Sequence, residues 1–242
     1  MQTWSNELGQ PLGKPLPDWQ NPPFPIATTL EGYGCRMEPL DVAKHSNALW
    51  EAFSEDIEGR VWTYLSVGPF ANKAGHDGWL RALASKSDPQ PYAIVDAATG
   101  LAAGIATYLR IAPETASIEV GWLTFSPRMQ KTKLATAAMF LLMRNAFKLG
   151  YRRYEWKCNS LNAPSHRAAE RLGFTFEGIF RQAAINKGRS RDTTWLSIID
   201  NEWPLLEVAF EQWLQADNFD AAGRQRSSLS ALTSAALAQR AT

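Results

Sequence analysis

Hydrophobic and polar positions change their period several times between residues 28 and 216. Apolar residues recur every three or four positions in some stretches, as in amphipathic helices, and alternate with polar residues in others, as in half-buried strands. The pattern predicts strands over 30–38, 92–95, 103–111, 116–125, 151–158, 174–185 and 190–200, and helices over 41–53, 72–86, 131–149, 162–172 and 202–215. Because helices and strands are interspersed, we expect one mixed α/β domain with about seven strands in its sheet.

Local signals mark where several of these helices begin and end. Asp41 and Asn72 are residues of the type that caps a helix N-terminus with a side-chain oxygen. Gly150 and Gly173 follow helical stretches, and glycine readily takes the left-handed conformation that ends a helix. Pro164 falls in the first turn of a predicted helix, where its missing N–H has no intrahelical partner.

Both ends of the chain differ in composition from this body. Prolines are concentrated between residues 11 and 25, and a residue without a backbone N–H does not join helix or sheet ladders, so this segment is expected to be extended. The other end is rich in Ala and Ser with a weak helical stripe, and is expected to be poorly ordered or in contact with another subunit. The predicted organisation is a proline-rich arm over 1–27, a domain with a C-terminal helix over 28–216 and a tail over 217–242.

The composition argues against several classes of function. Lys and Arg number 25 against 24 Asp and Glu, and a net charge of +1 gives no field that would attract a nucleic acid. Two cysteines and three widely separated histidines disfavour a disulfide framework and a metal centre, so we expect no metal. No basic, apolar leader and no long apolar run is present, so a cytoplasmic protein with reduced thiols and no membrane segment is expected.

The start of the predicted helix at 131–149 is a candidate anion site. Helix N-termini present free N–H groups and the positive end of the dipole, and basic side chains at the same place add charge. A basic first turn exposed to solvent is the simpler interpretation. A nucleotide phosphate loop is disfavoured, because neither GxxxxGK[ST] nor GxGxxG occurs. The residues concerned are Gln130, Lys131, Thr132, Lys133, Leu134, Ala135 and Thr136, preceded by Arg128.

Three further motifs follow this loop in a fixed order. The loop reads Gln130-Lys131-Thr132-Lys133-Leu134-Ala135, and a later helix begins Asn162-Ala163-Pro164-Ser165 and ends Gly173-Phe174. Together with Trp156-Lys157-Cys158-Asn159 and Gly188-Arg189-Ser190-Arg191-Asp192, they make residues 28–200 resemble the GNAT superfamily of acyl-CoA-dependent N-acetyltransferases. Within that superfamily the chain looks like the branch of the ribosomal-protein-alanine acetyltransferases. It departs from the pattern where Lys133 replaces the first glycine of the loop.

The resemblance implies a fold and a donor. The fold is a mostly antiparallel, twisted sheet flanked by helices, with acetyl-CoA in a gap between the strands at 116–125 and 151–158. The loop at 130–136 would hold the pyrophosphate, and Asn162 the pantetheine arm. The pantetheine would also pair with the free edge of the first strand, at Leu123 and Phe125. The superfamily's frequent tyrosine acid falls at Ala169, and Ser165, expected near the thiol sulfur, is its substitute.

Two residues are candidates for proton transfer. Strand alternation places Glu119 on the face opposite Ile118, Val120 and Trp122, so Glu119 is the best candidate for the base that takes a proton from an amine. A solvent-facing strand carboxylate or the partner of an arginine is the alternative. Ser165 is the candidate donor of a proton to the leaving thiolate, with a helix-capping hydroxyl as its alternative.

The acceptor pocket is expected from the segment at 54–64, between the first two helices. Its carboxylates, Glu55 with Asp56 and Glu58, would attract a cationic amine. The alternative is an acidic surface loop in which a tryptophan anchors the core. The expected wall residues are Trp62, Tyr64, Tyr108 and Trp122, although Tyr108 and Trp122 fit sheet core equally well.

The sequence therefore predicts an acetyl-CoA-dependent N-acetyltransferase that acts on a primary amine, either a protein N-terminus or a small amine. Direct attack in a ternary complex is expected, because Cys158 has no base nearby in sequence and fits a buried thiol. A non-catalytic acyl-CoA-binding module is the alternative, favoured by Lys133 and Ala169. A homodimer is a further expectation, from the proline-rich arm and the helix at 202–215.

Overall fold

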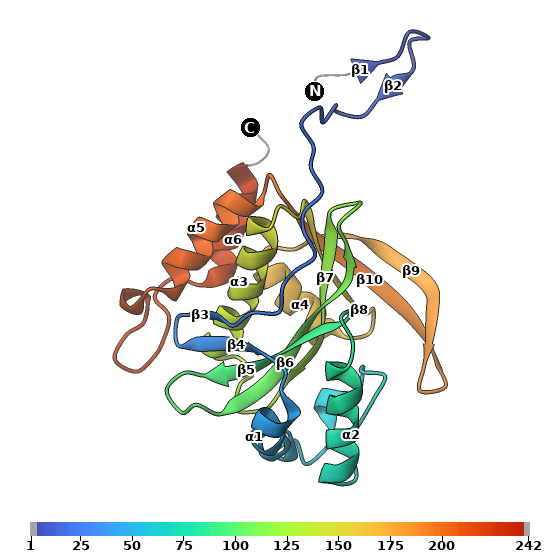
Figure 1. Cartoon of the computed structure of the whole chain (residues 1–242). Helices are drawn as coiled ribbons and strands as arrows, with labels where there is room; N and C mark the ends of the chain where they lie inside the picture. Colours follow the sequence, from blue (N-terminus) through green and yellow to red (C-terminus); the bar gives the residue numbers. More distant parts are fainter. Residues whose placement is uncertain (1–3, 240–242) are drawn as a thin grey trace.

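An eight-stranded sheet forms the centre of the computed structural model, which describes residues 4–239 (Figure 1). Its strand order is β3-β4-β5-β6-β7-β8-β10-β9, and β7 and β8 are parallel whereas the other neighbouring pairs are antiparallel. The predicted mixed α/β fold is confirmed. The strands are β3 (Leu30–Gly32), β4 (Cys35–Pro39), β5 (Gln90–Asp96), β6 (Ala102–Ala112), β7 (Ser117–Phe125), β8 (Arg153–Asn159), β9 (Thr175–Asn186) and β10 (Arg189–Ile199).

Helices cover both faces of this sheet. Neighbouring residues of β5 divide between two apolar clusters: Ile94 packs in the cluster with α3, α5 and α6, and Val95 packs in the one with α1 and α2. Figure 1 shows α1 and α2 together at one end of the molecule and α3, α5 and α6 at the other. No helix within residues 4–239 is long and apolar enough to cross a membrane. The helices are α1 (Val42–Ser54), α2 (Lys73–Ala84), α3 (Lys133–Lys148), α4 (Ala163–Arg171), α5 (Trp203–Leu214) and α6 (Leu229–Ala238), with short 3-10 turns η1 (Arg60–Trp62) and η2 (Ala216–Asn218).

Each helix and strand predicted from the sequence is present, with ends shifted by a few residues. The predicted caps are in place: the Asp41 carboxylate accepts from Ala43 N at 2.9 Å, and Asn72 Oδ1 accepts from Gly75 N at 3.0 Å. The sheet has one strand more than expected, because the predicted strand at 30–38 is a hairpin. Tyr33 and Gly34 both take positive φ, which reverses the chain between β3 and β4.

The C-terminal segment is folded onto the domain. Leu229, Thr233 and Ala236 of α6 are buried, and Thr233 Oγ1 donates to the backbone oxygen of Arg171 at 3.2 Å. The apolar residues of α6 recur every three or four positions, and the stripe they form packs against α5 and α4. The expectation of poor order is therefore wrong for residues 217–239, whereas contact with another subunit stays a prediction, and residues 240–242 lie outside the described part.

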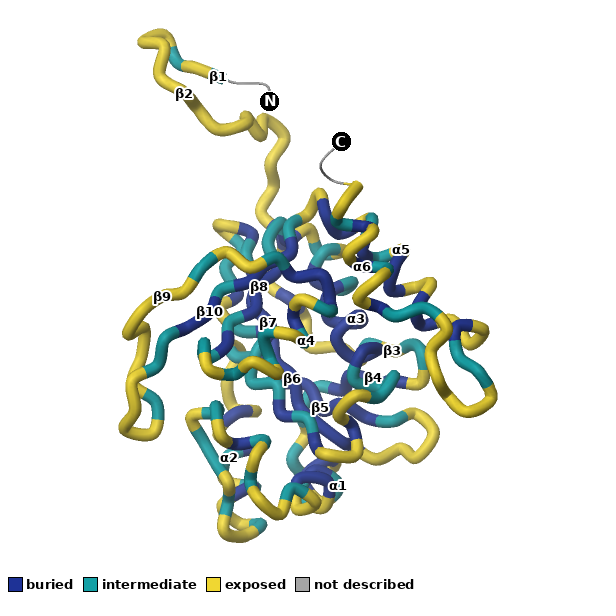
Figure 2. Tube along the Cα trace, turned by 180° about the vertical axis from the view of Figure 1, so that it is seen from behind, coloured by how far each residue is buried: buried dark blue, intermediate teal, exposed yellow. Residues whose placement is uncertain are grey.

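The proline-rich arm runs along the body only in its last part. Pro22 and Pro25 are buried, and the backbone oxygens of Pro23 and Pro25 accept from Tyr151 Oη at 3.2 Å and Gln90 Nε2 at 2.9 Å. Before this point a small hairpin of β1 (Trp4–Ser5) and β2 (Pro11–Leu12) projects away from the domain, and Figure 2 shows it almost wholly exposed.

A buried carboxylate on β4 makes folding sensitive to acid. Burial raises the pKa of Glu38, but hydrogen bonds from Lys44, His45 and Arg36 outweigh this effect and lower the pKa to about 2. Because the folded pKa lies below the ordinary 4.5, the carboxylate stabilises the fold above about pH 4.5, and this contribution disappears as the pH falls towards 2. We expect Glu38→Gln to lower the free energy of unfolding by roughly 3 kcal/mol at neutral pH.

Urea denaturation across the acid range measures this effect. The difference between wild type and Glu38→Gln should shrink steadily below about pH 4.5. Glu31→Gln, which removes an exposed carboxylate from neighbouring β3, is the matched control and should show little difference at any pH. A Glu38→Gln deficit that does not change with pH would contradict the assignment.

Candidate active site

The two parallel strands pair over only part of their length. Ser117–Val120 of β7 pair with Arg153–Trp156 of β8, and beyond Val120 the strands have no ladder between them. At this point β7 also bulges away from the regular register with β6, and Trp122 takes a φ of 49°. Positive φ in a bulky residue is strained, and such residues cluster at functional sites. The predicted gap between these strands is therefore present in the fold.

The bulge also corrects one expectation about strand alternation. Ile118 and Val120 are buried as predicted, with 0% and 1% of their surface exposed. Trp122 does not continue this buried series, because the extra residue of the bulge breaks the period of two. It lines a cavity beside Glu119 instead.

The larger of two cavities at the gap, about 900 Å³, lies at the N-terminus of α3. Most of the loop predicted to bind the donor lines it, whereas Leu134 packs against the apolar core. Pro164, Ala168 and Arg171 of α4 form another side. Of the predicted donor-site residues, Phe125, Gln130, Lys131, Thr132, Lys133, Ala135 and Thr136 line this cavity, and Leu123, Asn162 and Ser165 line its neighbour.

The loop before α3 leaves backbone donors free. Thr132 caps the helix, with its hydroxyl accepting from Ala135 N at 3.4 Å and donating to the Met129 oxygen at 2.6 Å. Within residues 4–239, the N–H groups of Lys131 and Lys133 have no hydrogen-bond acceptor. Lys133 stands inside α3 and does not have positive φ, so it replaces a glycine without backbone strain. Free N–H groups at a helix start are suited to an anion.

The C-terminal segment supplies a wall of this cavity that sequence patterns did not indicate. Phe219, Trp213 and Gln225 line it, and Lys133 Nζ lies 4.9 Å from the centre of the Phe219 ring. The Arg171 guanidinium lies 5.1 Å from the Trp213 ring and donates to Thr136 Oγ1 at 3.1 Å. Burial lowers the pKa of Arg171, and no carboxylate within the described residues pairs with it. Its charge is available to an anionic ligand.

The smaller cavity, about 310 Å³, opens between β7, β8 and the α1–α2 loop. Trp156 lines both cavities, so the two lie next to each other at this residue. Trp156 Nε1 donates to Ser165 Oγ at 3.1 Å, and Ser165 N donates to Asn162 Oδ1 at 3.2 Å. Ser165 thus lines the smaller cavity beside Trp156, with its backbone N–H held by the helix cap and its hydroxyl also within hydrogen-bond reach of the Cys158 thiol.

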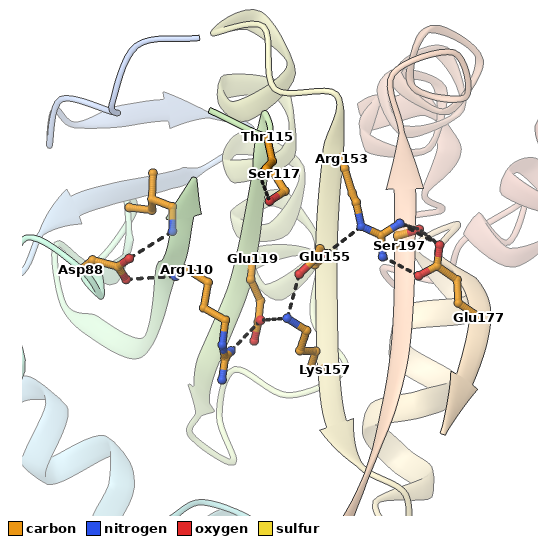
Figure 3. A network of polar contacts seen from close by, with 11 residues as sticks. Asp88, Arg110, Thr115, Ser117, Glu119, Arg153, Glu155, Lys157, Glu177 and Ser197 are labelled. Carbon is orange, nitrogen blue, oxygen red and sulfur yellow. Dashed lines mark hydrogen bonds and ion pairs between the residues drawn. The ribbon is translucent and has the colours of Figure 1, made fainter. Parts of the chain in front are cut away.

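Glu119 belongs to a row of alternating charges that crosses the sheet (Figure 3). Its Oε2 atom accepts from Arg110 at 2.6 Å and lies 2.8 Å from Lys157 Nζ, so the alternative of an arginine partner is observed. Its Oε1 atom has no hydrogen-bond partner within the described residues and lies near Gly121, where an added Cβ would be 3.5 Å away. Glu119 is also buried and is the one carboxylate among the residues that line the smaller cavity.

The row continues away from the cavity. Lys157 Nζ is 2.8 Å from a Glu155 oxygen, and Arg153 bonds Glu155 at 2.6 Å and Glu177 at 2.8 Å. Burial raises the pKa of Glu155, but hydrogen bonds from Lys157 and Arg153 lower it overall. The hydrogen bond from Arg153 likewise lowers the pKa of Glu177. Glu155 and Glu177 are therefore held in their charged form.

The structure corrects much of the predicted acceptor pocket. Tyr64 and Trp122 line the smaller cavity, as expected. Tyr108 does not: it is fully buried in the core and donates to the Leu142 oxygen at 2.5 Å, so the sheet-core alternative is correct. Trp62 anchors the α1–α2 cluster against Phe53 and lies outside this cavity.

The predicted acidic residues are also engaged elsewhere. Glu55 pairs with Arg128, whose hydrogen bond lowers the pKa of Glu55. Asp56 accepts from the backbone N–H groups of Arg60 and Val61 at 3.0 and 2.8 Å. None of these carboxylates lines the smaller cavity, so the interpretation of an acidic surface loop fits better.

A cavity with free backbone donors beside one with a carboxylate and a hydroxyl is suited to acyl transfer, and comparisons with known proteins identify the family. Residues 36–175 match the model of the acetyltransferase (GNAT) domain. The chain is 42% identical to a GCN5-related N-acetyltransferase from Brucella melitensis, over 90% of this chain and 100% of that one, with a TM-score of 0.88. The chain therefore belongs to the GNAT acetyltransferase family, and the resemblance seen in its motifs is confirmed.

Other solved structures extend this likeness. A probable GNAT-family acetyltransferase from Chromobacterium violaceum is 38% identical over 80% of this chain and 97% of that one, with a TM-score of 0.75. RimJ from Mycobacterium smegmatis, solved in complex with CoA-disulfide, shares the fold at 19% identity over 74% of this chain and 90% of that one, with a TM-score of 0.61. No curated protein matches the chain.

Both thiols should be unreactive in the folded protein. Cys158 lines the smaller cavity, and burial raises its pKa, although Ser165 and Arg191 oppose this effect. Burial raises the pKa of Cys35 to about 12. Since the thiolate is the reactive form, we expect a colorimetric disulfide reagent to modify neither thiol at neutral pH in native protein and both after denaturation. Rapid modification of one thiol in the native state would contradict this assignment and favour a nucleophilic cysteine.

Proposed function

We propose that the protein transfers an acetyl group from acetyl-CoA to a primary amine by direct attack within a ternary complex. The observation that carries this proposal is that two cavities share Trp156 as a lining residue, where β7 and β8 stop pairing. The larger cavity suits the donor and the smaller one suits an amine. Ser165 and Glu119 both line the smaller cavity, together with Trp156. The RimJ neighbour, solved with CoA-disulfide, supports a coenzyme A donor.

The larger cavity fits the charge and size of coenzyme A. Its volume of about 900 Å³ is within the range of cofactor sites, and its surroundings combine free N–H groups with the cations Lys131, Lys133 and Arg171. Bound acetyl-CoA supplies an activated thioester whose carbonyl carbon accepts an amine. The edge of β7 beyond Val120 carries no ladder to β8, so its N–H groups can receive the pantetheine arm and the thioester oxygen.

Glu119 takes the proton that the acceptor amine must lose. Arg110 and Lys157 both hold Oε2, which fixes the carboxylate and leaves Oε1 as the proton acceptor, directly or through a water molecule. From Glu119 the proton passes to solvent. Separation of the anchoring oxygen from the reacting oxygen explains how a residue with two cationic partners can still act as the base.

Ser165 supplies a proton to the leaving group of the reaction. A carbon–nitrogen bond forms, the carbon–sulfur bond breaks, and the sulfur leaves as a thiolate that takes the Ser165 hydroxyl proton. Ser165 then regains a proton from solvent. Because Trp156 Nε1 donates to Ser165 Oγ, the indole orients the hydroxyl and stabilises the oxygen while it lacks its proton. The methyl side chain of Ala169 carries no proton to donate, so no acid acts from that position.

Replacing the proposed base separates an enzyme from a non-catalytic acyl-CoA-binding module. We expect Glu119→Gln to lower kcat by about 10²–10⁴-fold while acetyl-CoA binds with unchanged affinity, because Glu119 lines only the acceptor cavity. Thiol release and calorimetric titration measure the two quantities. Glu155→Gln is the matched control, since it removes the neighbouring carboxylate of the same row but does not face the cavity.

The outcomes of this test are distinct. Equal loss of kcat in Glu155→Gln would show that the row acts as a structural unit, and Glu119 would lose its assigned role. Unchanged turnover in Glu119→Gln would remove it from the mechanism outright. Binding of acetyl-CoA by the wild type without turnover on any amine would favour the non-catalytic module.

The donor site depends on the unpaired guanidinium of Arg171. We expect Arg171→Gln to weaken coenzyme A binding by roughly 10-fold or more, because a charge-assisted contact to phosphate is lost. Calorimetry with coenzyme A and with dephospho-coenzyme A measures this loss. Arg167→Gln, an exposed charge change on the same helix, should leave the affinity unchanged. Equal affinity in wild type and Arg171→Gln would contradict the assignment.

A further inference from the structure

One charge in the acceptor cavity is left without compensation. The charged residues that line it are three cations, Arg110, Lys157 and Arg191, and one anion, Glu119. Arg110 and Lys157 belong to the row of alternating charges, in which three cations meet three carboxylates (Figure 3). That row is neutral by itself, so Arg191 gives the cavity its net positive charge.

Arg191 stands on β10, opposite Ala184 of the edge strand β9. Its Nε atom is buried and has no hydrogen-bond partner, and within residues 4–239 the side chain forms no ion pair. Neighbouring Asp192 forms no ion pair with it in the described part of the chain, and its Oδ1 atom accepts from Gln182 N at 2.7 Å. A buried donor without a partner is costly in a folded protein, and it is commonly satisfied by a ligand, an ion or a water molecule.

Hydrogen bonds between distant segments hold the rim of this cavity. The tip of the β9–β10 hairpin is tied to the α1–α2 loop, with Lys187 Nζ donating to the backbone oxygens of Trp62 at 2.8 Å and Gly68 at 2.7 Å. Tyr64 spans from the same loop to the Leu161 oxygen at 3.0 Å. The cavity volume of about 310 Å³ is that of a site for a small molecule.

We propose that Arg191 binds a carboxylate carried by the acceptor, so that the substrate is a small amino acid-like molecule and not a simple amine or a protein N-terminus. The inference rests on the proposed acetyltransferase function and deepens it. The guanidinium holds the carboxylate, which directs the amino group of the same molecule towards Glu119 and the junction at Trp156. The predicted attraction of a cationic amine by acidic loop residues does not operate here, because Arg191 recognises the opposite charge.

Paired substrates test this inference. Free α-amino acids and their α-amides carry the same amine and differ in the carboxylate, and thiol release with acetyl-CoA measures kcat/KM for each. We expect wild type to prefer the free acids by at least ~30-fold, mostly through KM, and Arg191→Gln to abolish the preference by losing activity on the acids alone. Arg191→Lys should retain part of it. Arg189→Gln, an exposed charge change on the same strand, is the matched control and should keep the full preference.

The result also separates this inference from the proposed function. Calorimetry with acetyl-CoA should give equal affinity in wild type and Arg191→Gln, which shows that the variant is folded and its donor site intact. Equal rates on acids and amides, or an unchanged preference in Arg191→Gln, would overturn the inference and leave the acetyltransferase proposal standing. Absence of acetyl-CoA binding in wild type would instead refute the proposed function.

Two further outcomes would show that the carboxylate belongs to the acyl donor or that the acceptor is a peptide. A preference of wild type for succinyl-CoA over acetyl-CoA that disappears in Arg191→Gln would place the carboxylate on the donor and overturn the acceptor assignment. Transfer to peptide N-termini with no transfer to any free amino acid would overturn the assignment of a small acceptor.

Discussion

The separation of two parallel strands is the constraint on which the rest of the structure depends. Once β7 and β8 stop pairing after Val120 and Trp156, backbone N–H groups on the β7 edge are left without a ladder. Two cavities occupy the gap, and the side chain that closes the paired part of β8, Trp156, is the one they share. The bulge at Trp122 sustains this separation, since it turns β7 out of register with β6 at the same level. The proposed donor and acceptor sites therefore lie at the same irregularity of the sheet.

Charge on either side of this gap is arranged for different ligands. At the donor side, α3 begins with free N–H groups, and Arg171 approaches from α4 without a carboxylate partner among the described residues. At the acceptor side, Arg110 and Lys157 hold one oxygen of Glu119, and Arg191 remains uncompensated. Buried charges are tolerated when a partner offsets the loss of hydration, so the two unpaired guanidinium groups indicate where anionic ligands belong.

Local signals in the sequence were sufficient for the elements and for a loop with free N–H groups before α3. Caps such as Asp41 and Asn72 act within one turn of a helix, and period-2 and period-3.6 patterns reflect burial along a single element. The loop before α3 could be identified for the same reason, because its free donors follow from the start of the helix. Here the prediction needed no knowledge of contacts between distant parts of the chain.

Features that depend on contacts between distant segments were missed. The bulge at Trp122 could not be inferred from alternation, and nothing local shows that Glu119 on β7 meets Arg110 on β6 and Lys157 on β8. Phe219 lies far from the donor loop in sequence, so its place against Lys133 depends on how the C-terminal segment packs. Acidic residues at 55–58 suggested an attractive pocket, but their charges are satisfied by neighbours outside the cavity.

A crystal structure of the protein with acetyl-CoA tests the central claim most directly. The account predicts that the pantetheine arm lies along the β7 edge beyond Val120, with the phosphates at the first turn of α3 and the thioester at the junction beside Ser165 and Trp156. Coenzyme A bound outside the gap, or with its phosphates away from the N–H groups of Lys131 and Lys133, would contradict it.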